Sequence, residues 1–319
     1  MDRNSAIGLT LIAVLLLVYF NYFAPEPPKE NPSSITTFEK SDSVSQAIVA
    51  ARDSVPATQD GPLESLTKGD EKLTKIETAD LILSFSNRGG VIKEVELKKF
   101  KTYYKKPLLL VASGSNDFKL TATYEGKDLD LYSLFYTIDS KQSQTFSQET
   151  KQNEDSTTVT FTTFLAEGKS IKQIYSIPAN GYQVNYNIQT SGIGDSFNGD
   201  HLTLYWKDNI PAVEKDLAAS RTKTTVNYFT TKGDFEDLSE SSTDLELEAI
   251  ASPVKWVGIK QKFFTSAIIA RNSFSGGEVS TSANLADTTI VKSALVKLFI
   301  PKSDVLANKA NFQFFFWPK

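Results

Sequence analysis

The chain contains no cysteine and only one histidine, His201. Without cysteine there is no disulfide, no thiolate nucleophile and no cysteine-ligated zinc, so a small disulfide-stapled scaffold is excluded. His201 lies in the segment DHLTLYWKD, where a role as general base or metal ligand would need partners that the sequence does not supply. We therefore interpret His201 as a strand or turn residue without a chemical role. We predict no catalytic, cofactor-binding or metal-binding residue.

The motifs of common enzyme classes are also missing. There is no G-x-S-x-G elbow, phosphate-binding P-loop, H-E-x-x-H helix or dinucleotide fingerprint. The net charge of -4 includes no basic field of the kind that nucleic acid requires. Trp206, Trp256 and Trp317 could form a platform for a sugar, but core packing is the interpretation that we favour. The protein is thus expected to act by contact, without covalent chemistry, a cofactor or a nucleic-acid partner.

One long apolar run is present, Ile7–Phe23, and no charged residue falls between Arg3 and Glu26. A helix rises about 1.5 Å per residue, so about 18 to 20 residues cross a hydrocarbon core of roughly 30 Å. Aromatic residues at the far end of the run suit the headgroup layer, and the prolines that follow stop the helix. We predict that residues 1–23 form a transmembrane signal-anchor that binds the lipid bilayer through Ile7–Phe23.

Two alternatives to an uncleaved anchor are open. A cleaved secretory signal has a similar basic start, but bulky aromatic residues stand where a cleavage site needs small ones. A buried core helix would need a second apolar helix to cover it, and the sequence has none. Arg3 and the free amino terminus predict that the short side stays in the cytoplasm and that the chain from Ala24 onward lies outside it.

Residues 24–75 are predicted to be a flexible polar linker. Proline, serine, threonine and acidic residues dominate this stretch, which cannot bury enough apolar surface to offset the entropy of ordering. Residues 44–55, VSQAIVAARDSV, could form a short amphipathic helix. A tether of about 50 residues would hold the following domain near the membrane without a fixed orientation.

From Thr74 onward apolar and polar residues alternate with the period of two that is typical of half-buried strands. Turn residues at Asn87–Gly90 and Pro178–Gly181 predict two hairpins. The expected strands are Lys75–Thr78, Leu81–Phe85, Val91–Leu97, Phe118–Ala122, Leu134–Ile138, Thr157–Phe164, Ser170–Ile177, Tyr182–Thr190, His201–Trp206, Thr224–Phe229, Thr288–Ser293, Leu295–Ile300 and Asn311–Lys319.

Three further segments are more ambiguous. Val254–Ala270 is predicted as a strand pair or as one strand bent at Gly258. Asn209–Ser220 could hold a helical turn, and the acidic run Gly233–Thr243 is predicted to be an exposed loop without the ligand spacing of a calcium site. The many strands without a fixed repeat predict that residues 76–319 form a mainly β, large antiparallel β-sandwich of two facing sheets.

Three stretches together resemble YidC-family membrane protein insertases, in the form typical of the Bacteroidetes group. The first is Met1–Ser5, followed at once by the apolar run and the proline-rich linker. The second is Leu83–Ile92, LSFSNRGGVI, which is similar to the strand–turn–strand at the start of that family's periplasmic domain. The third and most specific is Lys255–Ile269, which is similar to the family's W-V-x-x-x-Q-x-[FY]-F-x-x-A stretch.

The resemblance implies a protein of the bacterial inner (plasma) membrane, with a cytoplasmic amino terminus and a periplasmic main domain. With its one apolar run, this chain is expected to be single-pass. It implies a β-super-sandwich that is galactose-mutarotase-like, with a short helical piece near its end. It also implies a membrane protein insertase and chaperone role, in which integral membrane proteins are inserted and folded alone or with the Sec translocon. Sec translocon components and nascent integral membrane proteins are then the expected partners.

One departure from the family pattern is large. Family members continue from a strand like Phe312–Phe316 into an amphipathic helix and five further spans, whereas this sequence ends at Lys319. We expect the chain to supply only the anchor and the periplasmic domain. The alternative hypotheses are a membrane-tethered carbohydrate-binding or aldose-epimerase-like protein, which would lack its usual histidine chemistry, and a passive envelope scaffold.

Overall fold

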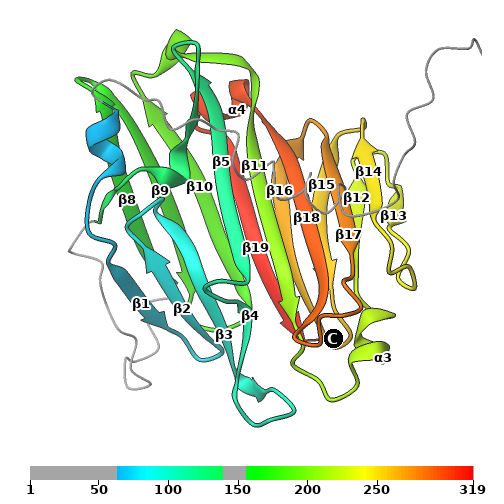
Figure 1. The fold of residues 1–319 in the computed structure, drawn as a ribbon. Coiled ribbons are helices and arrows are strands. Elements are labelled where there is room, and N and C mark those ends of the chain that lie inside the picture. Colours follow the sequence, from blue (N-terminus) through cyan, green and yellow to red (C-terminus); the bar gives the residue numbers. More distant parts are fainter. Residues whose placement is uncertain (1–62, 139–155, 319) are drawn as a thin grey trace, which may run out of the picture. The chain divides into compact units, whose positions relative to one another are not determined.

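The computed structural model describes residues 63–138 and 156–318, and their strands form three antiparallel sheets (Figure 1). The four-stranded sheet has the order β1-β2-β3-β4, with strands Leu73–Glu77, Leu81–Ser86, Val91–Lys101 and Pro107–Val111. The six-stranded sheet has the order β14-β17-β18-β11-β5-β6, with strands Glu246–Ile250, Gly277–Ser282, Ile290–Pro301, Phe197–Pro211, Asn116–Tyr124 and Lys127–Asp130. The nine-stranded sheet has the order β13-β12-β15-β16-β19-β10-β9-β8-β7, with strands Phe235–Asp237, Thr225–Thr230, Val254–Lys260, Phe264–Phe274, Ala310–Pro318, Gln183–Ser191, Lys169–Pro178, Ser156–Ala166 and Thr137–Ile138.

The nine-stranded sheet is one layer of a sandwich, and the two smaller sheets lie side by side in the other. Phe85 of β2 contacts Tyr175 of β9 with ring centroids 4.9 Å apart, which fixes the four-stranded sheet against the large one. Phe118 of β5 meets Phe314 of β19 at 6.4 Å and does the same for the six-stranded sheet. The mainly β, antiparallel sandwich that the alternation predicts is confirmed, with three sheets instead of two.

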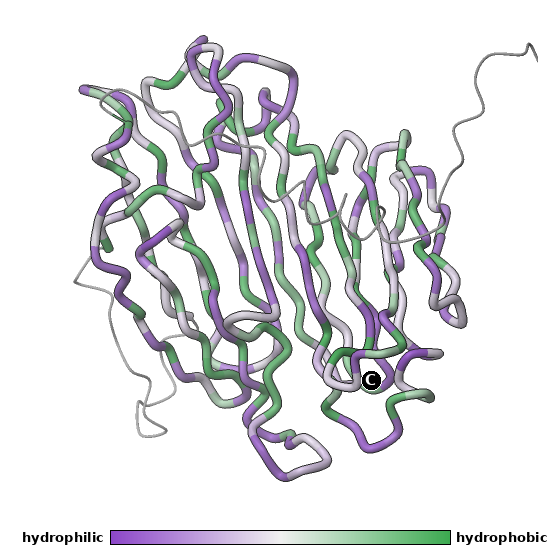
Figure 2. The backbone as a smooth tube through the Cα atoms, in the orientation of Figure 1, coloured by the Kyte–Doolittle hydropathy of each residue, from purple (hydrophilic) through white to green (hydrophobic). Residues whose placement is uncertain are grey.

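Alternation along the strands explains why both layers share one core. In β8 every second side chain from Thr157 to Leu165 is buried and the others face outward, and β18 behaves in the same way over most of its length. Figure 2 shows hydrophobic and hydrophilic positions interleaved along the strands. Each strand can therefore bury one face and leave the other in water.

Both predicted hairpins are confirmed. β2 and β3 pair around Asn87–Gly90, and β9 and β10 pair around the second turn. Gly89 and Gly90 have φ values of 82° and 58°, which favour glycine because a Cβ would be strained there. A Cβ on Gly89 would also lie 2.7 Å from the Tyr132 carbonyl oxygen, so this turn has room for glycine alone.

Several predicted strand boundaries are wrong. The two predicted strands Thr288–Ser293 and Leu295–Ile300 merge into one strand, β18, which begins at Ile290, because its pairing with β11 runs unbroken from Ser293 to Pro301. Val254–Ala270 forms a strand pair, as one of the two alternatives had it, but Gly258 lies in regular pairing within β15. The irregularity falls between Val254 and Trp256 instead.

The segment Leu134–Ile138 is the clearest miss, since only Thr137–Ile138 is strand. A 3-10 helix, η2 (Leu131–Ser133), precedes it, and the backbone of this segment bonds to the β2–β3 turn. Gly89 N–H donates to the Leu134 carbonyl at 2.7 Å, and Tyr136 N–H donates to the Asn87 carbonyl at 2.8 Å. The Leu134 carbonyl and the Tyr136 N–H therefore bond to the turn, whereas in a strand they would bond to a neighbouring strand.

The helices within residues 63–138 and 156–318 are short. They are the 3-10 helices η1 (Glu64–Thr67), η2 and η4 (Gly194–Ser196) and the α-helices α3 (Leu217–Arg221) and α4 (Lys302–Leu306). The helical turn expected in Asn209–Ser220 corresponds to α3, which Asp216 caps by accepting from Ala219 N–H at 2.9 Å. Strands β4, β6, β14 and β17 have no counterpart among the predicted strands, and β13 falls within the run predicted as an acidic loop.

The predicted anchor in residues 1–23 and the predicted helix in 44–55 lie outside the described residues. Within residues 63–138 and 156–318, no helix combines the length and the apolar character needed to cross a bilayer. The described part of the stretch predicted as linker contains η1 and the start of β1 at Leu73. Leu66 of η1 accepts a hydrogen bond from Phe135 N–H at 2.7 Å, so this part packs on the domain.

Candidate functional site

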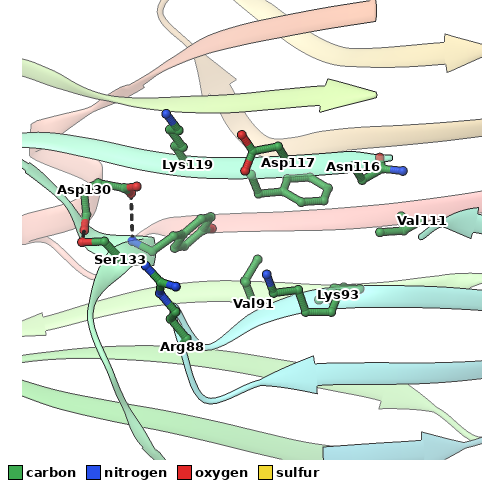
Figure 3. A pocket seen from close by; sticks show the side chains of 12 residues that line it. Arg88, Val91, Lys93, Val111, Asn116, Asp117, Lys119, Asp130 and Ser133 are labelled. Atoms are coloured by element: carbon green, nitrogen blue, oxygen red, sulfur yellow. Dashed lines mark hydrogen bonds between the residues drawn. The ribbon is translucent and has the colours of Figure 1, made fainter. Parts of the chain in front are cut away.

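The inter-sheet cleft is the space between the four-stranded and six-stranded sheets where they lie side by side. Its volume is about 250 Å³. Both of its walls carry charged side chains: Arg88 and Lys93 come from the β2–β3 hairpin, and Asp117 and Lys119 come from β5. Figure 3 shows the two groups facing each other across the gap. The cleft thus presents cations on one wall and charges of both signs on the other.

Asp130 holds one corner of the inter-sheet cleft in place. Its carboxylate accepts from Leu120 N–H at 3.1 Å and from Tyr132 N–H at 3.0 Å, and its carbonyl accepts from the Ser133 hydroxyl at 2.7 Å. Burial raises the pKa of Asp130, and the two backbone donors oppose that rise. Because the Asp130 carboxylate already accepts from two backbone N–H groups, we interpret it as a structural cap of η2.

A buried tyrosine network lies beneath the cleft. The Tyr132 and Tyr186 hydroxyls are 2.8 Å apart, Tyr186 donates to the Gln173 side-chain oxygen, and Gln173 donates to Tyr136 at 3.4 Å. Tyr136 in turn donates to the Leu131 carbonyl at 3.1 Å. Burial raises the pKa of all three tyrosines, so they stay neutral and join η2 to the large sheet.

Asp208 of β11 pairs with Asn116, which lines the inter-sheet cleft, and is only 1% exposed. Neither of its carboxylate oxygens has a hydrogen-bond partner. Burial raises the pKa of Asp208 to about 8, and the nearby Asn116 amide acts in the opposite direction. The Asn116 carbonyl oxygen is occupied by the Trp206 indole N–H at 3.0 Å. Asp208 is therefore a neutral acid inside the core near neutral pH, without an opening to a substrate.

A second depression, the amide groove, lies on the outer face of the nine-stranded sheet. Its volume is about 500 Å³, and β9, β10, β16 and β19 contribute its lining. Asn187 donates to Asn311 at 2.5 Å across the β10–β19 pair, and Gln313 donates to Asn185 at 3.1 Å. Arg271 is the charged residue of its lining. The groove offers amide donors and acceptors to a polar ligand.

The residues singled out by sequence are not brought together. His201 is exposed on β11 with its ring 4.4 Å from that of Phe299. Trp206 is buried and stacks on Phe118 at 5.7 Å, which confirms core packing for that residue. Trp256 stacks on Phe229, and Trp317 is half exposed beside Phe315. No ring contact joins two of the three tryptophans in the described part of the chain, so they do not form one platform.

Sequence reasoning missed both depressions. The inter-sheet cleft lies between the β2–β3 hairpin and β5, which begins 26 residues after Gly90. No local sequence pattern predicts that these two segments are neighbours. The amide groove did leave a signal, because Gln183, Asn185 and Asn187 recur with a period of two on β10. Across residues 63–138 and 156–318 there is no group of side chains that could hold a metal ion.

The fold and its depressions define the class, a large antiparallel β-sandwich domain with a charged cleft and an amide groove. The sequence profile described as the YidC periplasmic domain matches residues 73–315. The chain belongs to the YidC periplasmic domain family. This confirms the resemblance that the Leu83–Ile92 and Lys255–Ile269 stretches carried.

Curated relatives extend the match to the whole chain. The membrane protein insertase YidC of Cytophaga hutchinsonii is 32% identical over 338 residues, which cover 100% of this chain and 52% of the relative. That of Porphyromonas gingivalis strain ATCC 33277 is 24% identical and covers 100% and 51%. The chain therefore spans about half the length of the curated relatives it matches.

Solved structures with a similar fold include a galactose mutarotase-like protein and an aldose epimerase homologue. A galactose mutarotase-like protein from Lactobacillus casei has a TM-score of 0.46 and 11% identity, over 77% of this chain and 100% of that chain. An aldose epimerase homologue from C. elegans has a TM-score of 0.40 and 9% identity, over 78% and 99%. At these values the likeness carries no argument about activity.

Proposed function

We propose that this chain takes part in the insertion and folding of integral inner-membrane proteins. In this proposal the β-sandwich is the periplasmic contact domain, Ile7–Phe23 is its membrane anchor with a cytoplasmic amino terminus, and the stretch between Phe23 and η1 tethers the two. The family match over residues 73–315 carries the proposal, because relatives that align with the whole chain are membrane protein insertases. Since the chain aligns with half of each relative, we assign to it anchoring and contact.

The inter-sheet cleft is the contact site that we assign to nascent membrane proteins. Its volume of about 250 Å³ suits one extended peptide segment better than a folded partner. Arg88 and Lys93 on one wall can pair with acidic side chains, while Asp117 on the other can accept from basic ones. Sec translocon components are the second class of partner that we propose for the domain.

Site-specific photocrosslinking in membranes tests this assignment. A photoreactive amino acid replaces Lys119, which lines the cleft, and a matched variant carries it at Lys232, which is exposed in the β12–β13 turn. Crosslinks to nascent membrane proteins or Sec components from position 119 and not from 232 would support the proposal. Equal crosslinking from both positions, or none from either, would overturn it.

We infer that the domain works without covalent catalysis, and the aldose-epimerase alternative is not favoured. Sugar epimerisation needs an acid and a base that face one substrate. The one histidine, His201, is exposed and lies against Phe299. Polarimetry with freshly dissolved glucose checks this point, and mutarotation above the rate without protein would refute a purely binding role.

A further inference from the structure

Exposed aromatic rings and lysines gather at one end of the sandwich. We call this surface the lysine–aromatic end and define it by Tyr103, Tyr104, Lys105, Lys106, Lys215, Lys262, Phe263 and Trp317. The exposed fractions are 50% for Tyr103 and 64% for Tyr104, and 46% for both Phe263 and Trp317. Such large exposed rings leave apolar surface in water, so they indicate a site of interaction.

The β3–β4 loop presents its two tyrosines in a preformed shape. Thr102 N–H donates to the Lys106 carbonyl at 2.9 Å, and Lys105 N–H donates back to the Thr102 carbonyl at 2.9 Å. Tyr103 N–H donates to the Val213 carbonyl at 2.9 Å, which ties the loop to the segment before α3. The Tyr103 and Tyr104 rings meet edge to face at 5.2 Å. A ligand would therefore meet a surface that is already ordered.

The opposite layer contributes the rest of this end. Phe100 of β3 and Phe264 of β16 meet across the layers with ring centroids 5.6 Å apart, so the β3–β4 loop and the β15–β16 turn share one end of the sandwich. Phe263 lies in that turn with the Lys262 ammonium 5.1 Å from its ring centre. Trp317 pairs with Thr265 at the end of β19. Figure 1 shows β19 ending at this side, away from α4.

The lysines at this end are free of carboxylates. Lys105, Lys106, Lys215 and Lys262 form no ion pair with any described residue, and the Lys215 ammonium lies 5.9 Å from the Tyr103 ring centre. Lysines a few residues earlier are paired, such as Lys99 with Asp80 at 2.6 Å. The acids beside Lys215 are Glu214 and Asp216, and the latter is engaged in capping α3. Unpaired positive charge persists here although the chain carries a net charge of -4.

We propose that the lysine–aromatic end docks on the anionic headgroup layer of the bilayer, an inference that rests on the membrane anchoring of the proposed function. Tyrosine and tryptophan rings favour the headgroup level, and each lysine near an anionic leaflet contributes about fivefold in binding. Tyr103, Tyr104 and Phe263 lie in loops, and Trp317 lies at the end of β19. None of these four exposed rings lines either of the two depressions. A protruding surface fits a flat bilayer, whereas a peptide partner would be expected to occupy a groove.

The chain lacks cysteine, so a single introduced cysteine can report on docking. Tyr104→Cys in the full chain, labelled with an environment-sensitive fluorophore, is reconstituted in vesicles of phosphatidylcholine with one part in three of phosphatidylglycerol. We expect quenching by lipids that carry a headgroup quencher, with loss of the quenching in phosphatidylcholine alone or in high salt. A second reporter, Phe263→Cys, reads the same surface from the other layer, and a third, at Lys232, serves as the far-end reference.

The matched variants compare two lysine triplets. Lys105→Gln, Lys106→Gln and Lys262→Gln together should lower the ratio of docked to free domain by about a hundredfold. The control triplet is Lys127→Gln, Lys232→Gln and Lys309→Gln, which changes the same charge at exposed positions beyond the far ends of β5, β12 and α4. We expect the control to leave quenching unchanged.

Three results would overturn lipid docking. The first is equal quenching in neutral and anionic vesicles, and the second is an equal loss of quenching in both lysine triplets. The third is a change in the emission of the fluorophore that polyglutamate produces but anionic vesicles do not. Because the readout is lipid contact, it is separate from crosslinking at Lys119. Failure of the insertase proposal would leave crosslinks absent while docking persisted, and failure of docking would leave the crosslinks intact.

Discussion

Asp208→Asn should change how the stability of the domain depends on pH. Asp208 is 1% exposed and its oxygens lack hydrogen bonds, and burial raises its pKa from the ordinary 3.8 to about 8. In the folded chain the acid keeps its proton up to about pH 8, whereas in the unfolded chain it loses the proton near pH 4. Folding therefore takes up a proton between these values, and the free energy of unfolding falls as pH rises through that window.

The magnitude follows from the shift. Each pH unit between about 4 and 8 removes up to about 1.4 kcal/mol of stability. From pH 5 to pH 8 this amounts to about 4 kcal/mol as an upper bound, because water entry or local movement lowers the cost of burying a charge. Asparagine has nearly the same shape and no proton to lose. The stability of Asp208→Asn relative to the unsubstituted chain should therefore grow steadily over this range.

Urea unfolding of the full chain in detergent, followed by tryptophan fluorescence at pH 5, 6, 7 and 8, measures the effect. Asp200→Asn, at an exposed position of the same strand, is the matched control and should track the unsubstituted chain at every pH. A difference between Asp208→Asn and the unsubstituted chain that stays constant from pH 5 to pH 8 would refute the reasoning. It would show that Asp208 ionises in the folded chain much as it does in the unfolded one.

Three further predictions concern stability, each measured by the same urea unfolding. Tyr186→Phe should cost about 1 to 3 kcal/mol because Gln173 and Tyr132 lose their hydrogen bonds to the Tyr186 hydroxyl. Tyr175→Phe should be neutral or stabilising because the Tyr175 hydroxyl has no partner. Equal effects of the two substitutions would contradict a stabilising role for the tyrosine network. Arg221→Met should cost about 2 to 4 kcal/mol, since the Arg221 guanidinium donates to the carbonyls of Val291, Asn284, Asp287 and Ile290. Arg271 is exposed, so Arg271→Met should change stability by less than about 0.5 kcal/mol. Gly89→Ala should cost about 3 kcal/mol or more, because its Cβ would lie 2.7 Å from the Tyr132 carbonyl oxygen at a φ of 82°. Gly114→Ala, at a φ of 87° with no atom within 4 Å, should cost only the backbone strain of about 1 to 2 kcal/mol. Equal costs would show that the contact with Tyr132 does not matter.

Side-chain alternation was sufficient to predict where most strands lie. The period of two in β8 and β18 reflects which face of a strand is buried, and that is a property of the strand alone. The turn residues Asn87–Gly90 were equally legible, because positive φ restricts the choice of residue at the turn itself. The Lys255–Ile269 stretch was specific enough to indicate the family, which the match over residues 73–315 confirms.

Strand pairing and the hydrogen bonding of polar groups could not be predicted in this way. Leu134–Ile138 alternates like a strand, yet its backbone bonds to the β2–β3 turn more than 40 residues earlier. Asp208 lies on the buried face of β11 with Leu204 and Trp206, as the period of two indicates, but the lack of a hydrogen-bond partner for its carboxylate depends on what the rest of the fold packs around it. Arg221 likewise finds four carbonyls that lie more than 60 residues away.

The sequence by itself determined the class of fold, the family and the absence of any disulfide, because these depend on composition, local periodicity and a contiguous motif. Only the tertiary structure decided that three sheets form the two layers, that a charged cleft opens between the smaller sheets, and that exposed rings and unpaired lysines share one end. Each of these depends on which distant strands become neighbours. Strand pairing is set by the free energy of the whole core, so no single segment encodes it.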